Sequence, residues 1–251
     1  MSIPYSDTTN KDGIIQNIED ECGFNDGDIT GNTTKFAKFN GDINQALDSI
    51  YAWIFKAGGV WQFDDSNHTD YPTITTDLVS AQRDYSFTID EQGNVILDIY
   101  KVMVADPDGI FHEIKPVDRQ TKNSNNVNVD SFIDGQETGG TPTRYDMTAN
   151  GIFLDPVPNY ASTGGLKVFI NREGSYFTVS DTTKKAGFNG LFHYLLVLLP
   201  AYKYARIHLG QDVRDRLKAD IDAMKADLMT SYGQRSRDIL RRLIPDIGDN
   251  R

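Results

Sequence analysis

The most apolar stretch of this chain runs from Gly190 to Gly210 and reads GLFHYLLVLLPAYKYARIHLG. Its apolar residues fall on nearly every side of a helical period, which is typical of a helix buried inside a protein. The uncharged run from Gly187 to Tyr202 would cover roughly 24 Å as a helix, short of the ~30 Å hydrocarbon core of a bilayer. We therefore expect a buried scaffold helix and no membrane span.

Local signals bound this helix and predict a second one after it. Asn189 is an expected N-cap, Pro200 is expected to kink the helix, and Gly210 is an expected left-handed C-cap. The next segment, QDVRDRLKADIDAMKADLMTSY (211–232), has apolar residues at three- and four-residue steps and charged pairs on the opposite face. Together the two segments predict an αα-hairpin. Its expected core is Leu191, Leu195, Leu198, Tyr202, Val213, Leu217, Ile221, Met224 and Leu228.

The partner of this hairpin is expected near the N-terminus. In NGDINQALDSIYAWIFKAG (40–58), Ile43, Leu47, Ile50/Tyr51 and Ile54 share one helical face, and Gly58 ends the pattern. KDGIIQNIEDECG (11–23) predicts a shorter helix. These segments and the hairpin together predict a three- or four-helix bundle made from the two chain ends.

The middle of the chain has the alternating pattern of β-strands from about Thr73 to Arg172. ILDIYKVMVA and IFHEIKPV flank the turn Asp106–Gly109 and predict a hairpin, and TRYDMTANGIFLDP predicts a second hairpin that turns at Asn150-Gly151. GLKVFINR adds a strand, and the Asn/Gly-rich residues 121–141 predict a long loop. No βαβ alternation is present, so a parallel doubly wound sheet is not expected.

These segments predict an α+β fold: a helical bundle formed by N- and C-terminal helices, with an inserted antiparallel β domain and a C-terminal arm. We expect an N-terminal arm and bundle helices in residues 1–72 and the β domain in residues 73–175. The αα-hairpin then occupies residues 176–233, and the arm occupies residues 234–251.

The composition argues against binding to nucleic acid through phosphate neutralisation. The formal net charge is −11, from 25 Lys and Arg against 36 Asp and Glu, whereas phosphate binding needs clustered cations. Residues 1–34 alone carry seven acidic residues against one lysine, a net −6. Cys22 is the only cysteine. We interpret it as a small buried apolar residue of a protein that folds in a reducing cytoplasm.

No catalytic signature is present. The chain lacks the phosphate-binding, dinucleotide, nucleophile-elbow and zinc-protease motifs, and its four histidines are far apart in sequence. We expect no enzyme activity, no metal and no cofactor.

Two features leave room for a carbohydrate-binding or calcium-binding module as the alternative function. The stretch from Thr8 to Glu19 is similar to a calcium loop, although Thr8 replaces its first aspartate. A cluster of aromatic residues would suit either sugar stacking or core packing. Its members are Tyr51, Trp53, Phe55, Trp61 and Phe63.

The order of the segments resembles the head-to-tail connector proteins of tailed bacteriophages, a family of adaptor, head-completion and tail-tube gatekeeper proteins. The resemblance covers about residues 40–232 and is an overall pattern rather than a catalytic motif. The segments that carry it are WIFKAGGVWQFDDSNHTDYPTITTDLVSAQRDYSF (53–87), KVMVADPDGIFHEIKPVDR (101–119), GIFLDPVPNY (151–160), GLKVFINRE (165–173) and GFNGLFHYLLVLLPAYKYA (187–205). The acidic N-terminal segment and the Asn-rich loop are outside it.

Such proteins form homo-oligomeric rings, usually of about twelve copies, beneath the capsid portal. The resemblance implies a structural virion protein, made in the host cytoplasm, that sits at the head-tail junction between the portal protein and a tail or nozzle protein. Genomic DNA would pass through its ring without sequence-specific binding. The resemblance also implies that the C-terminal arm binds the portal. The expected portal-binding residues are Arg235, Arg237, Arg241, Arg242, Leu243 and Ile244.

Overall fold

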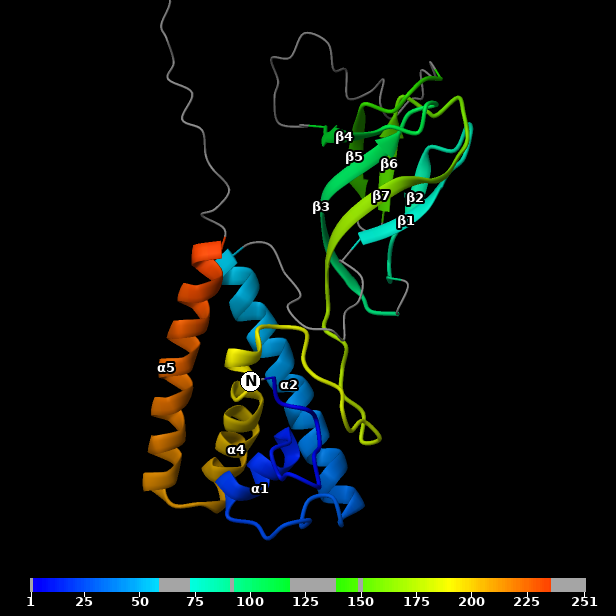
Figure 1. Cartoon of the computed structure of the whole chain (residues 1–251). Helices are drawn as coiled ribbons and strands as arrows, with labels where there is room; N and C mark the ends of the chain where they lie inside the picture. The colour runs from blue at the N-terminus through cyan, green and yellow to red at the C-terminus, as the bar shows by residue number, and fades with distance from the viewer. Residues whose placement is uncertain (1, 59–72, 91–92, 118–138, 149–150, 236–251) are drawn as a thin grey trace, which may run out of the picture. The chain divides into compact units, whose positions relative to one another are not determined.

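The computed structural model divides the chain into two compact units (Figure 1). One unit combines residues 1–69 with residues 174–251, and the other is residues 70–173, so the second is an insertion into the first. These boundaries lie within three residues of the expected ones. Helices and a mostly antiparallel sheet confirm the α+β class. The structure describes residues 2–58, 73–90, 93–117, 139–148 and 151–235.

The helical unit contains four α-helices and one 3₁₀ turn within the described residues. The short N-terminal helix is found where it was predicted. The second helix starts at Thr33, seven residues before the expected start, because the Asn32 side chain upstream accepts a hydrogen bond from the Lys35 N–H. The elements are α1 (Ile14–Cys22), α2 (Thr33–Gly58), η1 (Gly190–Phe192), α4 (Leu195–His208) and α5 (Gln211–Arg235).

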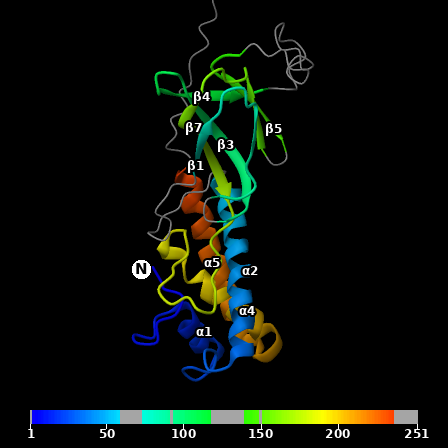
Figure 2. The same cartoon turned by 90° about the vertical axis from the view of Figure 1, so that its right-hand side faces the viewer.

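One apolar core holds this unit together. The predicted stripe of α2, including Ile43, Leu47 and Ile54, is fully buried. Helix α4 packs against α1, α2 and α5. Figure 1 shows α4 between α2 and α5, and Figure 2 shows α2 in front of it when seen from the side. Because α4 has neighbours on several sides, it needs apolar residues around most of its circumference.

Of the expected hairpin core, five residues are buried and three are partly buried against the same core. Leu195, Leu198, Leu217, Ile221 and Leu228 are the buried residues. Tyr202, Val213 and Met224 are the partly buried ones. The hairpin therefore packs largely through the face that its periodicity indicated.

Leu191 does not belong to that core, and this corrects the prediction. Its exposed fraction is 70%. The apolar stretch is not one helix: η1 and a short turn precede α4, which begins only at Leu195. A 3₁₀ turn has three residues per turn rather than 3.6, so Leu191 loses the phase that it would share with Leu195 in a continuous helix.

The ends of the stretch match one predicted cap and contradict the other. Asn189 is an N-cap, since its side chain accepts a hydrogen bond from the Leu191 N–H, but it caps the 3₁₀ turn rather than α4. Helix α4 ends with Leu209 in an extended conformation, and Gly210 has no positive φ. The left-handed glycine cap predicted at Gly210 is therefore wrong. Pro200 lies inside α4, as predicted.

The other unit is a seven-stranded sheet with the order β1-β7-β3-β4-β5-β6-β2. Both predicted hairpins are present, as the antiparallel pairs β3–β4 and β5–β6. Strand β4 pairs with β5 in parallel, so the domain is not wholly antiparallel as predicted. The strands are β1 (Thr73–Leu78), β2 (Asp84–Ser86), β3 (Ile96–Ala105), β4 (Phe111–Pro116), β5 (Arg144–Thr148), β6 (Gly151–Asp155) and β7 (Ser162–Arg172).

A buried ion pair joins the end of β7 to the loop before β3. The Arg172 guanidinium donates to the Asp90 carboxylate, and the two side chains are only 3% and 7% exposed. Asn94 also donates to Asp90 through its backbone and side chain. Burial raises the pKa of Asp90, but the hydrogen bonds from Asn94 and Arg172 outweigh it, and the pKa lies below its usual range.

Candidate assembly surface

The expected portal-binding residues lie at the limit of the described chain. Arg235 is the last residue of α5, and its side chain is not described. Arg237, Arg241, Arg242, Leu243 and Ile244 lie outside the described residues. The candidate surface therefore has to be built from the helices themselves.

The first part of this surface is a groove between η1, the start of α4 and the middle of α5. It has a volume of about 390 Å³, and the exposed Leu191 forms part of its wall. Apolar side chains make up most of the lining, and two exposed aspartates of α5 complete it. We call it the Leu191 groove: Leu191, Phe192, Tyr194, Leu198, Asp220, Ala223, Met224 and Asp227.

The second part lies at the other end of α4, where Ile207 is 72% exposed. Ile207 shares a shallow depression with Lys38 of α2 and with Lys203 of α4. The Lys203 ammonium pairs with Asp42 at 2.5 Å and leaves about half of its side chain in solvent. We call the residues that line this depression the Ile207 patch: Lys38, Phe39, Asp42, Lys203, Tyr204, Ile207 and His208.

These two surfaces face different directions on α4. Nine residues separate Leu198 of the groove from Ile207, and nine residues are about 2.5 turns of an α-helix. Half a turn of residual rotation places the two side chains on opposite sides of the helix. Leu191 and Ile207 are the two most exposed large apolar residues of the described chain.

One carboxylate ties the groove to the helices around it. Glu21 of α1 accepts a hydrogen bond from the Tyr194 hydroxyl at 2.7 Å and one from the Arg216 guanidinium at 2.9 Å. Burial and this carboxylate raise the pKa of Tyr194, so the phenol remains a proton donor to Glu21. Glu21 of α1 and Arg216 of α5 thus fix the side of the groove formed by Tyr194, which directly precedes α4.

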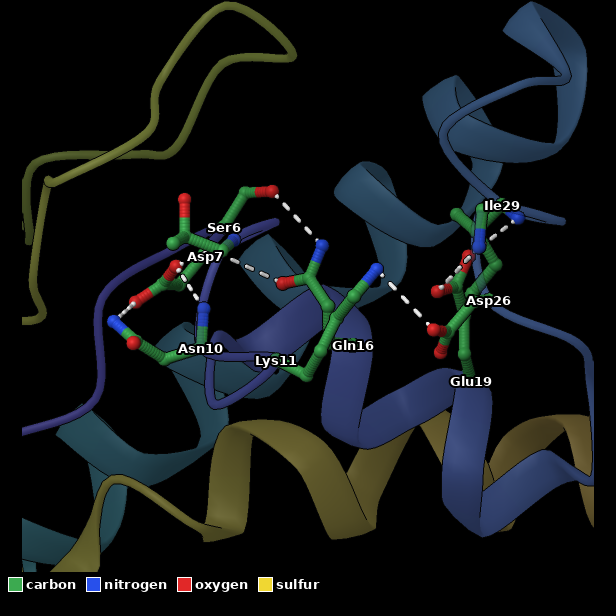
Figure 3. A network of polar contacts seen from close by, with 10 residues as sticks. Ser6, Asp7, Asn10, Lys11, Gln16, Glu19, Asp26 and Ile29 are labelled. Atoms are coloured by element: carbon green, nitrogen blue, oxygen red, sulfur yellow. Dashed lines mark hydrogen bonds and ion pairs between the residues drawn. The ribbon is translucent and has the colours of Figure 1, made fainter.

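The stretch that is similar to a calcium loop folds into a different polar network (Figure 3). Glu19, in the position of the expected last ligand, is 1% exposed and accepts hydrogen bonds from the N–H groups of Gly27 and Ile29, the latter at 2.7 Å. Its carboxylate therefore holds the loop between α1 and α2.

The rest of the network orders the chain before α1. Asp7 accepts hydrogen bonds from the N–H groups of Asn10 and Thr9, and these bonds lower the pKa of Asp7 to about 2. The Gln16 side chain accepts from the Asp7 N–H and donates to the Ser6 hydroxyl (Figure 3). These contacts occupy the polar groups internally. Within the described parts of the chain, no group of three or more His, Cys, Asp or Glu residues could hold a metal ion.

His193 attaches the N-terminal segment to the core. Its ring is fully buried, with Nδ1 3.2 Å from the Ile3 nitrogen and Nε2 2.9 Å from the Phe188 carbonyl oxygen. Burial lowers the pKa of His193 below its usual range. The neutral ring then accepts from Ile3 and donates to Phe188, which is the role of a core histidine.

Of the expected aromatic cluster, the described residues belong to the helical core. Tyr51 is buried, and Trp53 and Phe55 pack partly against the same core. The Lys225 ammonium lies 4.3 Å from the centre of the Trp53 ring. Trp61 and Phe63 lie outside the described residues. Core packing therefore accounts for the three described members of the cluster.

Two further observations bear on the chemistry of the chain. Cys22 is buried, as expected, and burial raises the pKa of Cys22 to about 12, so its thiol is unreactive at neutral pH. Among the described residues, no helix combines the length and the apolar character needed to cross a membrane.

Sequence reasoning missed the Leu191 groove, because the exposure of Leu191 depends on a break in the helix that its apolar pattern does not signal. Ile207 carries a weak signal, since it is an apolar residue between Arg206 and His208 in a helix end rich in basic residues.

No protein-family model matches the chain, and no curated protein matches it either.

Proposed function

We propose that this chain is a structural protein of the head-to-tail junction of a tailed bacteriophage, where about twelve copies form a ring beneath the portal. The observation that carries the proposal is the arrangement of the helical unit. Residues from before and after the inserted sheet build it, and two surfaces with exposed apolar side chains, Leu191 and Ile207, lie near the two ends of α4.

The charge of the chain supports a DNA passage. At a net charge of −11, an acidic lumen repels phosphate, so DNA can slide without a salt-dependent affinity that would hold it. Asp12, Asp20 and Asp28 are exposed acidic residues that remain available for such a wall. The ring acts without a cofactor and has no catalytic step.

The proposal assigns portal binding to the residues after α5. Their sequence combines Arg237, Arg241 and Arg242 with aliphatic neighbours, a composition that suits an acidic surface with apolar pockets. Deletion of residues 236–251, which begins after the last residue of α5, is expected to abolish binding to the portal and to leave the helical unit folded. Circular dichroism checks the fold of the truncated protein.

Negative-stain microscopy of the protein mixed with portal-bearing capsids tests the proposal. Rings seated at the portal vertex are the expected result, and native mass spectrometry of the detached assembly gives the copy number. A chain that never binds capsid vertices, and instead binds glycans or calcium in a calorimetric titration, contradicts the connector proposal and supports the alternative module.

A further inference from the structure

We infer that the Leu191 groove of one copy receives the Ile207 patch of the next copy, so that the two surfaces form one head-to-tail contact. This inference rests on the proposed function for its biological role, but the contact itself is argued from the helical unit alone.

One surface offers an apolar groove and the other an exposed aliphatic side chain. The groove has a volume of about 390 Å³ and is lined by Leu191, Leu198 and Met224. Ile207 projects from α4 with 72% of its surface in solvent. Inserting such an exposed aliphatic side chain into an apolar groove is favourable, because apolar surface of the side chain and of the groove is removed from water together.

The charges around these apolar parts are also complementary. Asp220 and Asp227 line the groove from α5, and both are exposed. Lys38 shares the depression with Ile207, and Arg206 is exposed next to it on α4. Lys203 and Asp42, which also line the depression, pair with each other, so Lys38 and Arg206 carry the positive charge of the patch. Opposite charges around an apolar centre favour this pairing, while groove against groove or patch against patch would bring like charges together.

The positions of the groove and the patch along α4 allow the contact to repeat from one copy to the next. Because the groove and the patch lie on opposite sides of the helix, each copy offers a free groove on one side and a free patch on the other. A contact between two different surfaces repeats from copy to copy and closes into a ring when the rotation permits. The patch is also displaced from the groove along the helix, since Ile207 is thirteen residues, or roughly 20 Å, beyond Tyr194. A ring without a rise therefore requires α4 to be inclined to the ring axis.

A paired-cysteine experiment tests the contact. The chain with both Ala223→Cys and Ile207→Cys is oxidised, and the products are separated on a non-reducing gel. We expect a ladder of dimers, trimers and larger species, because every copy carries both halves of the contact. Each single variant is expected to stay monomeric, and a mixture of the two single variants is expected to stop at the dimer. Cys22 can be left in place because it is buried and unreactive at neutral pH.

The matched control pairs Ala223→Cys with Ser49→Cys, an exposed position on α2. It should give no ladder. A ladder from the control that equals the ladder from the test pair overturns the inference, as does a strong dimer from Ile207→Cys alone, which would indicate a symmetric contact. Absence of any ladder from the test pair also overturns it.

A charge-exchange experiment gives an independent test. Asp220→Lys with Asp227→Lys, or Lys38→Glu with Arg206→Glu, is expected to weaken self-association roughly tenfold or more in sedimentation velocity. Combining the four changes in one chain should restore association to within a few fold, since the attraction is rebuilt with reversed sign. All four residues are exposed, so the fold should tolerate the changes. Failure of the combined variant to recover contradicts the contact.

Failure of the contact and failure of the connector role have different outcomes. If Ile207→Asp forms rings on portals as well as the parent chain does, the connector role is supported and this contact is excluded. If the cysteine pair gives a ladder but the protein never binds portals, the contact is supported and the connector role is excluded.

Discussion

The helical unit and the sheet unit use polar groups differently. In the helical unit, buried polar residues such as Glu19 and His193 hold backbone groups of loops and of the N-terminal segment onto an apolar core. In the sheet unit, the buried pair Asp90 and Arg172 carries full charges and joins the loop before β3 to the end of β7. A network with backbone groups tolerates a neutral replacement better than a buried ion pair does, because a broken pair leaves a charge without its counterion.

The largest effect should therefore come from breaking the ion pair. Asp90→Ala is expected to destabilise the sheet unit by about 3–5 kcal/mol, since the buried Arg172 charge loses its ion pair with the Asp90 carboxylate. Hydrogen exchange followed by mass spectrometry checks this, with faster exchange expected in β3 and β7. Equal acceleration in α2 would show that the two units do not differ in the proposed way.

A pair of leucines four residues apart gives the next largest difference. Leu195→Ala removes a fully buried side chain from the helical core and should cost about 2–5 kcal/mol. Leu191→Ala is the matched control and should change stability by no more than about 0.5 kcal/mol, because Leu191 is exposed. Urea unfolding curves measure both. A comparable loss from the two variants would mean that Leu191 is part of the core after all.

Neutralising the carboxylate of Glu19 should have a smaller effect on the free energy of unfolding. Glu19→Gln keeps one acceptor oxygen and loses the charge, so one of the two hydrogen bonds to Gly27 and Ile29 weakens, at a cost of about 1–3 kcal/mol. Asp20→Asn, on the exposed neighbour, is the control and should be close to neutral. Thermal unfolding in the presence of calcium adds a sharper test. Stabilisation of the parent chain by calcium, lost in Glu19→Gln, would favour a cation site over the loop-holding role.

Protonation of His193 should have the smallest effect on the free energy of unfolding. Burial lowers the pKa of His193, so the unfolded chain, with a histidine pKa of about 6.5, binds the proton more readily than the folded chain. Stability from the neutral ring is therefore complete above about pH 6.5 and is lost as the pH falls below it. His193→Gln should show a shallower decline of unfolding free energy between neutral and acidic pH. An identical decline in both proteins would exclude His193 as the cause.

Local patterns accounted for much of the helical unit. The apolar stripe of α2 and most of the hairpin core are buried as their three- and four-residue steps indicated, because a helical face is defined by residues close together in sequence. Leu191 broke this rule. A 3₁₀ turn and the break before α4 depend on how the preceding loop meets the core, and periodicity alone does not encode that.

The sheet unit was less predictable. The hairpins β3–β4 and β5–β6 join neighbours in sequence through short turns, and their alternation with turn residues indicated them. The pairing of β1 with β7, and the parallel pairing of β4 with β5, join strands whose partners are set by packing across the sheet. Neither pairing has a local signature.

The candidate surface shows the same division. The sequence alone determined that the chain is acidic, that apolar helices come from both of its ends and that a β region lies between them, because composition and periodicity are local properties. Only the tertiary structure decided that Leu191, before α4, and Ile207, near its end, stay in solvent, with Asp220 and Asp227 beside one surface and Lys38 beside the other. Which apolar residues remain uncovered depends on how distant segments fill the core, and that is a property of the whole fold.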